Sequence, residues 1–291
     1  MKILIFGGGG MLGHKLVQVL KKNFEVWTTL RSSFETYEKF NLYDKNKTLE
    51  KVNVTNVEDI EKVIESIKPE VIINAIGIIK QLPKSKDLID TLTVNSIFPH
   101  RLAELSKKNK AYLLNISTDC VFSGTKGNYT EEDIPDALDL YGKSKNLGEV
   151  TDNNCLTIRT SIIGRELLTR HSLVEWFLNN RKKKVKGYVN AIFSGFPTVV
   201  LAQLISDIIT KKNRLEGLFH VSSEPIDKFT LLKLVKEKFK VDVEIERFEE
   251  FKIDRSLNSD KFRKAMGFKP LNWEQMIDKM AEDSVLSKGY K

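Results

Sequence analysis

A tyrosine and a lysine, Tyr141 and Lys145, stand four residues apart in the middle of the chain. In a helix this spacing places both side chains on one face, one turn apart. An ammonium group beside a phenol stabilises the phenolate, so we expect Lys145 to lower the pKa of Tyr141 toward neutrality. Such a phenol can donate and accept protons near neutral pH, and the upstream hydroxyl of Thr118 can hydrogen-bond a substrate oxygen. The three side chains together predict proton transfer to or from that oxygen.

Five glycines lie between the first apolar run and the first helical pattern, at positions 7, 8, 9, 10 and 13. They fit either Gly8-x-Gly10-x-x-Gly13 or the longer spacing Gly7-x-x-Gly10-x-x-Gly13. Both patterns predict a tight turn that brings the backbone close to a pyrophosphate, at a helix N-terminus whose free N–H groups favour anions. A strand before the glycines and a helix after them favour a dinucleotide-binding turn. The residues expected against the cofactor are Gly7, Gly10, Met11, Leu12 and Gly13.

The end of the second predicted strand bears on the choice between the two nicotinamide cofactors. An Asp or Glu there would bind the ribose hydroxyls of NAD. This strand ends instead in Arg31 and Ser32, and a guanidinium beside a hydroxyl suits the extra 2′-phosphate of NADP(H). We therefore expect NADPH as the cofactor. Asn53 is expected at the adenine edge, and Ala75 and Gly77 are small enough to let the cofactor lie close.

These residues need elements to position them, and apolar runs alternate with helical patterns through the first half of the chain. Strands are predicted at 2–6, 25–30, 70–75, 111–117, 156–163, 217–221 and 241–248. Helices are predicted at 11–21, 58–68, 99–107, 141–150, 172–178, 199–210, 229–239 and 273–285. Apolar strands that alternate with helices form a parallel sheet covered on both faces. The predicted fold class is therefore α/β, a doubly wound parallel (Rossmann) sheet with a smaller C-terminal α/β lobe.

The alternation loosens beyond residue 164, which suggests a division of the chain into two units. We predict a cofactor-binding domain made of residues 1–164 plus about 199–221. A substrate-binding lobe would consist of about 165–198 and 222–291. The basic run at 181–186 lies between these patterns and is interpreted as a short loop.

The composition is that of an ordinary soluble globular protein, with 41% hydrophobic and 30% charged residues. The net charge is +8, but the basic residues are scattered, so we expect no nucleic-acid partner. No apolar run reaches the roughly 18–20 residues of a membrane span, and the N-terminus lacks the features of a signal peptide. A cytoplasmic protein without a membrane partner is expected. Only Cys120 and Cys155 occur, and they predict neither a disulfide framework nor a metal site.

Several motifs follow one another in the order of a known family. Besides the glycine turn, they are Ser117-Thr118-Asp119-x-Val121-Phe122, Tyr129-x-Glu131-x-Asp133, Tyr141-Gly142-x-Ser144-Lys145-x-x-Gly148-Glu149, Arg159-Thr160, Gly195-x-Pro197-Thr198 and Gly217-Leu218-Phe219-His220. Along essentially its whole length the chain resembles the extended short-chain dehydrogenases/reductases, and among them the dTDP-4-dehydrorhamnose reductase (RmlD-like) family.

The resemblance implies a catalytic triad of Thr118, Tyr141 and Lys145, with the last two also against the cofactor. It implies that NADPH delivers hydride to carbon 4 of a dTDP- or UDP-linked 6-deoxy keto sugar, in deoxysugar and polysaccharide biosynthesis. Homodimers are common in the family, although no segment here demands one. The substrate contacts implied are Cys120, Val121, Phe122 and Arg255.

The chain departs from the family pattern at two places. Cys120 stands where the family usually has Tyr, which leaves the identity of the sugar open, and packing is the simpler role for this residue. The family's usual Arg-Pro becomes Arg255-Ser256. A guanidinium fork suits a diphosphate, but Arg255 can equally be a surface residue.

Three other functions share parts of the same pattern. A 4,6-dehydratase typically has an acidic residue where this chain has Cys120, which argues against dehydration. An epimerase needs only the same triad, but epimerases tend to hold NAD permanently, whereas Arg31 favours an exchangeable NADP(H). The regulatory subunit of methionine adenosyltransferase resembles the same family and works by binding a partner enzyme, and the intact triad favours catalysis over that role.

Overall fold

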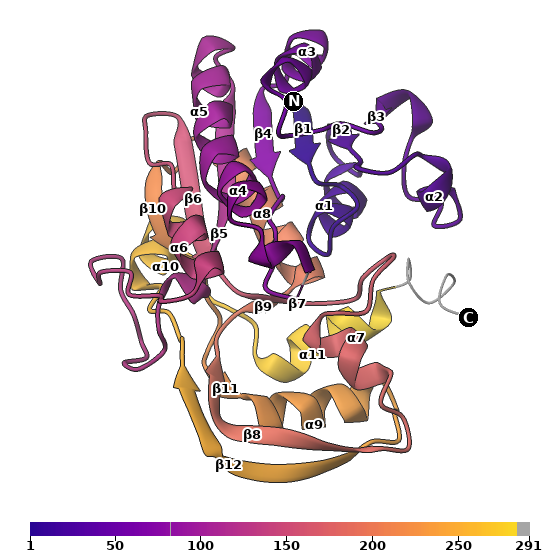
Figure 1. Ribbon diagram of the computed structural model, residues 1–291, viewed down its shortest axis with the longest axis vertical. Helices are drawn as coiled ribbons and strands as arrows, with labels where there is room; N and C mark the ends of the chain where they lie inside the picture. Colours follow the sequence, from indigo (N-terminus) through magenta and orange to yellow (C-terminus); the bar gives the residue numbers. More distant parts are fainter. Residues whose placement is uncertain (82, 284–291) are drawn as a thin grey trace.

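The computed structural model describes residues 1–81 and 83–283, and within them seven parallel strands form the central sheet (Figure 1). The strands are β1 (Lys2–Phe6), β2 (Glu25–Thr29), β3 (Thr48–Leu49), β4 (Val71–Asn74), β5 (Tyr112–Thr118), β6 (Cys155–Thr160) and β10 (Gly217–His220). Their order is β10-β6-β5-β4-β1-β2-β3, so the winding reverses between β1 and β4. In doubly wound sheets the carboxyl ends of the strands open a crevice at that point. The predicted fold class is confirmed.

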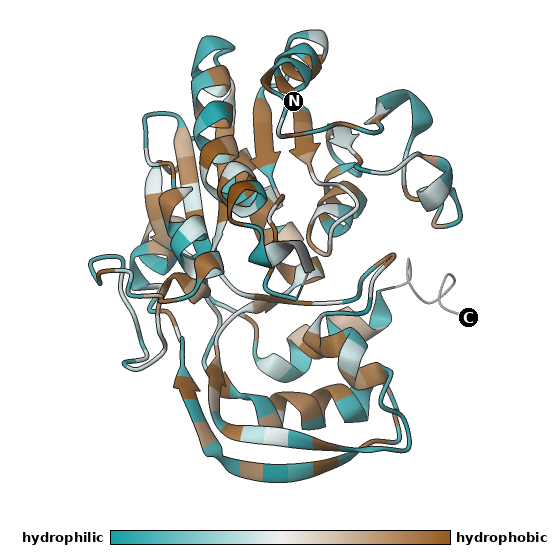
Figure 2. Ribbon diagram, in the orientation of Figure 1, coloured by the Kyte–Doolittle hydropathy of each residue, from teal (hydrophilic) through white to brown (hydrophobic). Residues whose placement is uncertain are grey.

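Helices cover both faces of this sheet because successive side chains of a strand point to opposite sides. In β1, Ile3 and Ile5 join one buried cluster, whereas Leu4 and Phe6 join the other. The first cluster is completed by α1 (Gly13–Leu20) and α8 (Thr198–Thr210), and the second by α3 (Val57–Ile67) and α5 (Phe98–Lys108). Figure 2 shows the strands of this sheet as largely apolar and the outer surfaces of the helices as polar.

A smaller mixed sheet lies beyond the carboxyl ends of β1 and β4, at the foot of Figure 1. In it β8 (Lys184–Phe193) is antiparallel to β11 (Ile226–Asp227) and parallel to β12 (Glu244–Asp254). The short strand β7 (Ile162–Ile163) pairs with β9 (Phe196–Pro197). The helices in this part of the chain are α7 (Leu173–Leu178), α9 (Lys228–Lys238), α10 (Asp260–Met266) and α11 (Trp273–Glu282).

Short helices and turns join these elements. They are α2 (Glu35–Glu38), α4 (Leu88–Leu92) and α6 (Leu140–Leu147), with 3₁₀ turns at Lys45–Lys47, Pro83–Lys86 and Asp119–Val121. A π-helical turn at Thr93–Ile97 connects α4 to α5, an irregularity that often marks functional sites. In the described part of the chain, none of the helices is both long enough and apolar enough to cross a membrane.

Two sequence predictions fail where the chain enters the smaller sheet. The strand expected at 156–163 is divided, because β6 pairs with β5 as far as Thr160 whereas β7 pairs with β9. The loop expected at 181–186 is wrong in its second half, since β8 begins at Lys184 and pairs with β12. Val185 is buried between exposed Lys184 and Lys186, so only a short alternation marked this strand. Neither the remainder of β8 nor α10 was predicted.

Other boundaries differ by a few residues. The strand expected at 241–248 begins later and continues as β12 to Asp254. The helix expected at 141–150 is α6, which ends at Leu147 with Gly148 at its C-cap. The helix expected at 273–285 ends at Glu282, and residues 284 and 285 lie outside the described residues.

Candidate active site

Parallel pairing brings the predicted site residues to one edge of the central sheet. Phe6 is the register partner of Asn74, which in turn pairs with Asn115. Gly7 therefore follows β1 beside Ala75, and a Cβ on Gly7 would lie 3.1 Å from the Ala75 carbonyl oxygen. Positions that are far apart in sequence meet because carboxyl ends of parallel strands share one edge.

The glycine turn needs glycine at positions of both spacings, since a Cβ on Gly8 would lie 2.1 Å from Thr28 Oγ1. Gly7 has a φ of +92°, a value that glycine adopts without strain. A Cβ on Gly13 would lie 2.0 Å from the Gly7 carbonyl oxygen, so only glycine lets the helix start so close to the strand. Leu12 is buried and Met11 is partly exposed. The turn delivers the N-terminus of α1 to the sheet edge, which fits a pyrophosphate.

Two tyrosines that sequence reasoning missed support this turn. The Tyr43 hydroxyl donates to the Gly8 carbonyl at 2.8 Å, and its ring meets Tyr37 edge-on at 5.6 Å. Ser32 and Arg31 lie near the Tyr37 hydroxyl and lower its pKa, although burial raises it more. Arg31 itself is exposed at the end of β2, so its guanidinium is accessible to an anionic group.

The remaining predicted cofactor contacts lie on the loops that follow β2 and β4. The Val52 N–H donates to the Leu30 carbonyl at 3.2 Å, so Asn53 stands near the end of β2. Its side-chain oxygen accepts from Thr55 N–H at 3.1 Å, which leaves the amide NH₂ for an adenine. Ala75 is partly exposed, and Gly77 is exposed.

Thr118, Tyr141 and Lys145 come together where β5 meets α6. Helix α6 approaches the strand closely, since a Cβ on Gly142 would lie 2.3 Å from the Cys120 carbonyl oxygen. The Thr118 hydroxyl lies close enough to the Tyr141 side chain to lower the pKa of the phenol. The Lys145 ammonium donates to the Ile116 carbonyl at 2.7 Å.

The expected effect of Lys145 on Tyr141 is wrong for the protein on its own. Burial raises the pKa of Tyr141, and the neighbouring Cys120 and Asp119 add to this rise, although the bond to Thr118 opposes it. The charge of Lys145 is directed at a backbone carbonyl instead, and burial lowers its own pKa to about 8. Tyr141 therefore keeps its proton at neutral pH, as a proton donor requires.

Basic side chains surround this group, and one of them, Lys80, was not predicted. Its ammonium pairs with Asp139 at 2.8 Å and lies 5.6 Å from the centre of the Tyr141 ring. Arg255 places Nη1 3.8 Å from the Cys120 sulfur. Burial raises the pKa of the Cys120 thiol to about 12, so this residue is neutral at physiological pH.

Two predicted substrate contacts, Val121 and Phe122, have side chains that are completely buried. Phe122 stacks on Tyr129 with ring centres 4.1 Å apart, and its carbonyl accepts from Arg255 Nε at 2.8 Å. Both side chains therefore pack in the interior instead of lining a surface, unlike Cys120, which is partly exposed.

Residues from several of the family motifs form a buried hydrogen-bonded group behind β5. Glu149 accepts from Ser117 Oγ at 2.6 Å and from Arg159 at 2.7 and 2.8 Å. Arg159 Nη1 lies 3.2 Å from His220 Nε2, whose other ring nitrogen bonds the Tyr129 carbonyl at 3.0 Å. Burial, with Arg159 nearby, lowers the pKa of His220 to about 4, so the ring is neutral. These residues hold the strand that carries Thr118.

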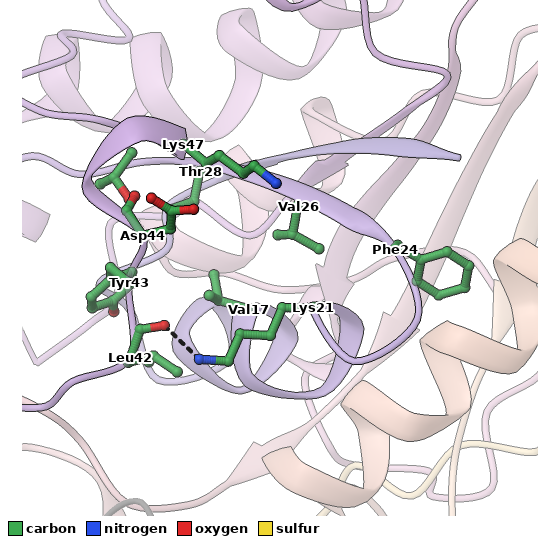
Figure 3. Close-up of a pocket in the computed structure, with 10 residues that line it drawn as sticks. Val17, Lys21, Phe24, Val26, Thr28, Leu42, Tyr43, Asp44 and Lys47 are labelled. Carbon is green, nitrogen blue, oxygen red and sulfur yellow. Dashed lines mark hydrogen bonds between the residues drawn. The ribbon is translucent and has the colours of Figure 1, made fainter.

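A cavity of about 220 Å³ lies elsewhere, between α1, β2 and the segment around Tyr43 (Figure 3). Lys21 lines this cavity, and its ammonium donates to the Leu42 carbonyl at 2.8 Å. None of the predicted site residues lines this cavity.

Comparisons with known proteins agree with this geometry. A family model described as RmlD substrate binding domain matches residues 1–285. The dTDP-4-dehydrorhamnose reductase of Aggregatibacter actinomycetemcomitans is 29% identical over 235 residues, which cover 77% of this chain and 74% of that protein. Methionine adenosyltransferase 2 subunit beta of Mus musculus is 31% identical over 160 residues, which cover 53% of this chain and 43% of that protein.

A solved structure shares the architecture over nearly the whole chain. It is dTDP-4-dehydrorhamnose reductase from Bacillus anthracis in complex with NADP, with a TM-score of 0.78 at 21% identity. The likeness covers 96% of this chain and 98% of that one. At this identity it bears on the fold alone.

Proposed function

The chain belongs to the RmlD substrate binding domain family of extended short-chain dehydrogenases/reductases, and on this premise we propose that it reduces the 4-keto group of a nucleotide-linked 6-deoxy sugar with NADPH. The observation that carries the proposal is the group of Thr118, Tyr141 and Lys145 at the carboxyl end of β5. The glycine turn and Ala75 lie at the same edge of the sheet. This arrangement supports a cofactor and a substrate that meet above β4 and β5.

NADPH, when bound, supplies the hydride that adds to carbon 4. Tyr141 donates the proton to the substrate oxygen, because its raised pKa keeps the phenol protonated at neutral pH. The Thr118 hydroxyl hydrogen-bonds the same substrate oxygen. In the protein on its own the Lys145 ammonium donates to the Ile116 carbonyl. With cofactor and substrate bound, its positive charge, which is present below its pKa of about 8, would favour the phenolate that Tyr141 becomes.

The cofactor contacts proposed are the glycine turn, Arg31 with Ser32, and the small residues Ala75 and Gly77. Arg31 favours NADPH over NADH because its exposed guanidinium can make a bidentate hydrogen bond to a 2′-phosphate. An epimerase that holds NAD permanently has less use for such a group. A dehydratase would need an acid at position 120, and the thiol of Cys120 stays neutral.

A second candidate, a non-catalytic NADP-binding regulatory subunit, is favoured by the likeness to methionine adenosyltransferase 2 subunit beta. Such a protein would bind NADPH and a partner enzyme in fixed proportion without turnover. The intact triad supports catalysis instead.

The decisive experiment follows NADPH oxidation by its near-ultraviolet absorbance, with dTDP- and UDP-linked 4-keto-6-deoxy sugars as substrates. We expect oxidation with at least one of them, and a loss of about a hundredfold or more in kcat for Tyr141→Phe with unchanged NADPH affinity. Tyr188→Phe, on β8, is the matched control and should keep full activity. Full activity of Tyr141→Phe would contradict the catalytic assignment. Tight NADPH binding without any oxidation would favour the epimerase or the regulatory subunit.

A further inference from the structure

The Thr118 hydroxyl at the end of β5 has two hydrogen-bond partners from the residues that follow it. The Cys120 N–H donates to its oxygen at 3.1 Å, and Asp119 Oδ1 lies 3.2 Å from the same oxygen. Both side chains are enclosed by the fold, since Asp119 is 6% exposed and Thr118 is 7% exposed. A substrate oxygen can therefore bond only to what these two contacts leave free on Thr118.

The direction of the hydrogen bond between Thr118 and Asp119 decides what remains free. A hydroxyl has one hydrogen to donate and two lone pairs that accept, and the Cys120 N–H takes one lone pair. An ionised carboxylate only accepts, so it takes the hydrogen of Thr118. Thr118 then offers the substrate a lone pair, and a keto oxygen, which also only accepts, cannot bond to it.

A protonated carboxyl reverses this hydrogen bond. It has a hydrogen of its own, which it donates to the second lone pair of Thr118 Oγ1. The hydrogen of Thr118 is then free to point at the keto oxygen. Both lone pairs and the hydrogen of Thr118 have partners in this arrangement, which is what a buried polar group requires.

The surroundings of Asp119 favour the protonated form. Burial raises the pKa of its carboxyl, although the guanidinium of Arg255 and the hydrogen-bond donors around it oppose the rise. In the described part of the chain, no cation lies at ion-pair distance from this carboxyl. The other groups that interact with it electrostatically are Lys228 at the start of α9, the Cys120 thiol and the Tyr141 phenol. The thiol and the phenol are neutral at physiological pH, so only the two cations oppose protonation by their charge.

We propose that Asp119 is a positioning residue that acts through Thr118: its protonated carboxyl donates to Thr118 Oγ1 and so directs the hydrogen of Thr118 at the substrate oxygen. The inference rests on the proposed function, which places that oxygen between Thr118 and Tyr141. Asp119 keeps its proton throughout, since the proton delivered to the oxygen is that of Tyr141. Reduction therefore depends on the protonated form of Asp119, and it slows as that proton is lost with rising pH.

The first measurement is the infrared difference spectrum between the wild-type protein and Asp119→Asn. At neutral pH it should contain the carbonyl stretch of one protonated carboxyl, and this band should disappear at the pH at which Asp119 ionises. Asp207→Asn, which removes an exposed carboxyl on α8, is the matched control and should leave the band in place. Absence of the band at neutral pH would overturn the proposal.

The second measurement compares kcat of the two proteins over a range of pH. An asparagine amide donates to Thr118 Oγ1 at every pH, so Asp119→Asn should keep kcat within about fivefold of the wild type at acidic pH, with an unchanged KM for NADPH. Above the pH at which the band disappears, kcat of Asp119→Asn should exceed that of the wild type by about tenfold. A band that persists at every pH requires a constant ratio. The effect of Lys145 is common to both proteins and cancels in this ratio.

Thr118→Val tests whether Asp119 acts through the hydroxyl. In a Thr118→Val background, Asp119→Asn should leave kcat unchanged at every pH, because no hydroxyl remains to be directed. The ratio of kcat in the wild type to kcat in Thr118→Val tests the same point with Asp119 intact, and it should fall as the band disappears.

Other outcomes would contradict the inference. A larger loss of kcat in Asp119→Asn at acidic pH would show that the carboxyl has a role that an amide cannot fill. A pH-dependent ratio that is the same with and without the Thr118 hydroxyl would show that Asp119 acts by another route. Absence of NADPH oxidation by the wild type would contradict the proposed function, whatever the infrared result. A wild type that turns over but lacks the band would contradict the positioning role alone.

Discussion

The proton on Tyr141 is held by its surroundings more than by its neighbour on the helix. The residue type and spacing indicate a shared face with Lys145, and α6 provides it. The direction of the pKa shift depends on burial and on the groups around Cys120, which belong to another segment. Spacing along one helix therefore locates the acid, but packing between elements decides its protonation state.

A first prediction concerns the pH dependence of reduction. Burial lowers the pKa of Lys145 from its usual value to about 8, so its charge is present below that pH and is lost above it. Because the charge favours the phenolate formed on Tyr141, kcat for reduction should fall as pH rises through about 8. Plots of kcat against pH should show this decrease in the wild type. Lys145→Met should have a low kcat that does not decrease through the same pH range. If kcat of Lys145→Met still decreased through about pH 8, the decrease would arise from the titration of another group.

A second prediction concerns cofactor choice at Arg31. Arg31→Ala should raise the KM for NADPH about tenfold and leave the KM for NADH nearly unchanged, because only NADPH carries the 2′-phosphate. Steady-state kinetics with both cofactors measure this. Arg181→Ala, another exposed arginine, is the control and should change neither value. Equal losses for the two cofactors would remove the argument for NADPH.

At the scale of elements, the most regular patterns of apolar residues predicted secondary structure most reliably. Helix α3 carries Ile60, Val63, Ile64 and Ile67 on one buried face, as its spacing predicts. Strand β8 was missed because its burial alternates only in part and its partner β12 lies far along the chain. An exposed strand of that kind is stabilised by its pairing more than by its own sequence.

A third prediction compares two glycines of the cofactor edge. Gly13→Ala should lower the free energy of unfolding by about 1–3 kcal/mol, because its Cβ would lie 2.0 Å from the Gly7 carbonyl oxygen. Gly77→Ala should leave stability within about 0.5 kcal/mol, since its Cβ would meet Asn95 at 3.5 Å. Urea denaturation measures both. NADPH affinity should fall in both variants; an unchanged affinity in Gly77→Ala would place Gly77 away from the cofactor.

At the scale of the whole molecule, a buried ion pair joins the first helix to the end of the last. Lys15 on α1 pairs with Asp283, which follows α11, and their side chains are 2% and 4% exposed. Gln18 completes the group, accepting from Lys15 at 3.0 Å and donating to Asp283 at 2.8 Å. The helix that begins at the glycine turn is thereby tied to the C-terminal part of the chain. Our proposal of two units, 1–164 plus about 199–221 and about 165–198 plus 222–291, makes this a contact between them.

A fourth prediction follows from that ion pair. Lys15→Met should lower the free energy of unfolding by about 3–5 kcal/mol, because it leaves the Asp283 carboxylate buried without its counter-charge. Combining it with Asp283→Leu should recover part of the loss. Lys238→Gln, in a pair with Asp278 whose side chains are 25% and 44% exposed, should cost much less than Lys15→Met, because water screens the exposed pair. Urea denaturation of the four proteins measures these differences, and a small loss for Lys15→Met would show that the pair contributes little.

The sequence by itself determined the parallel sheet, the glycine turn and the candidate triad, because these depend on local periodicity, on backbone freedom and on spacing within one helix. Only the tertiary structure decided which groups surround Tyr141, that Val121 and Phe122 face inward, and that Lys80 approaches the site. Burial and long-range electrostatics depend on elements that meet across the fold, and their partners lie tens to more than a hundred residues away in the sequence. That is why the chemistry could be located from the residues, whereas its protonation and its basic surroundings could not.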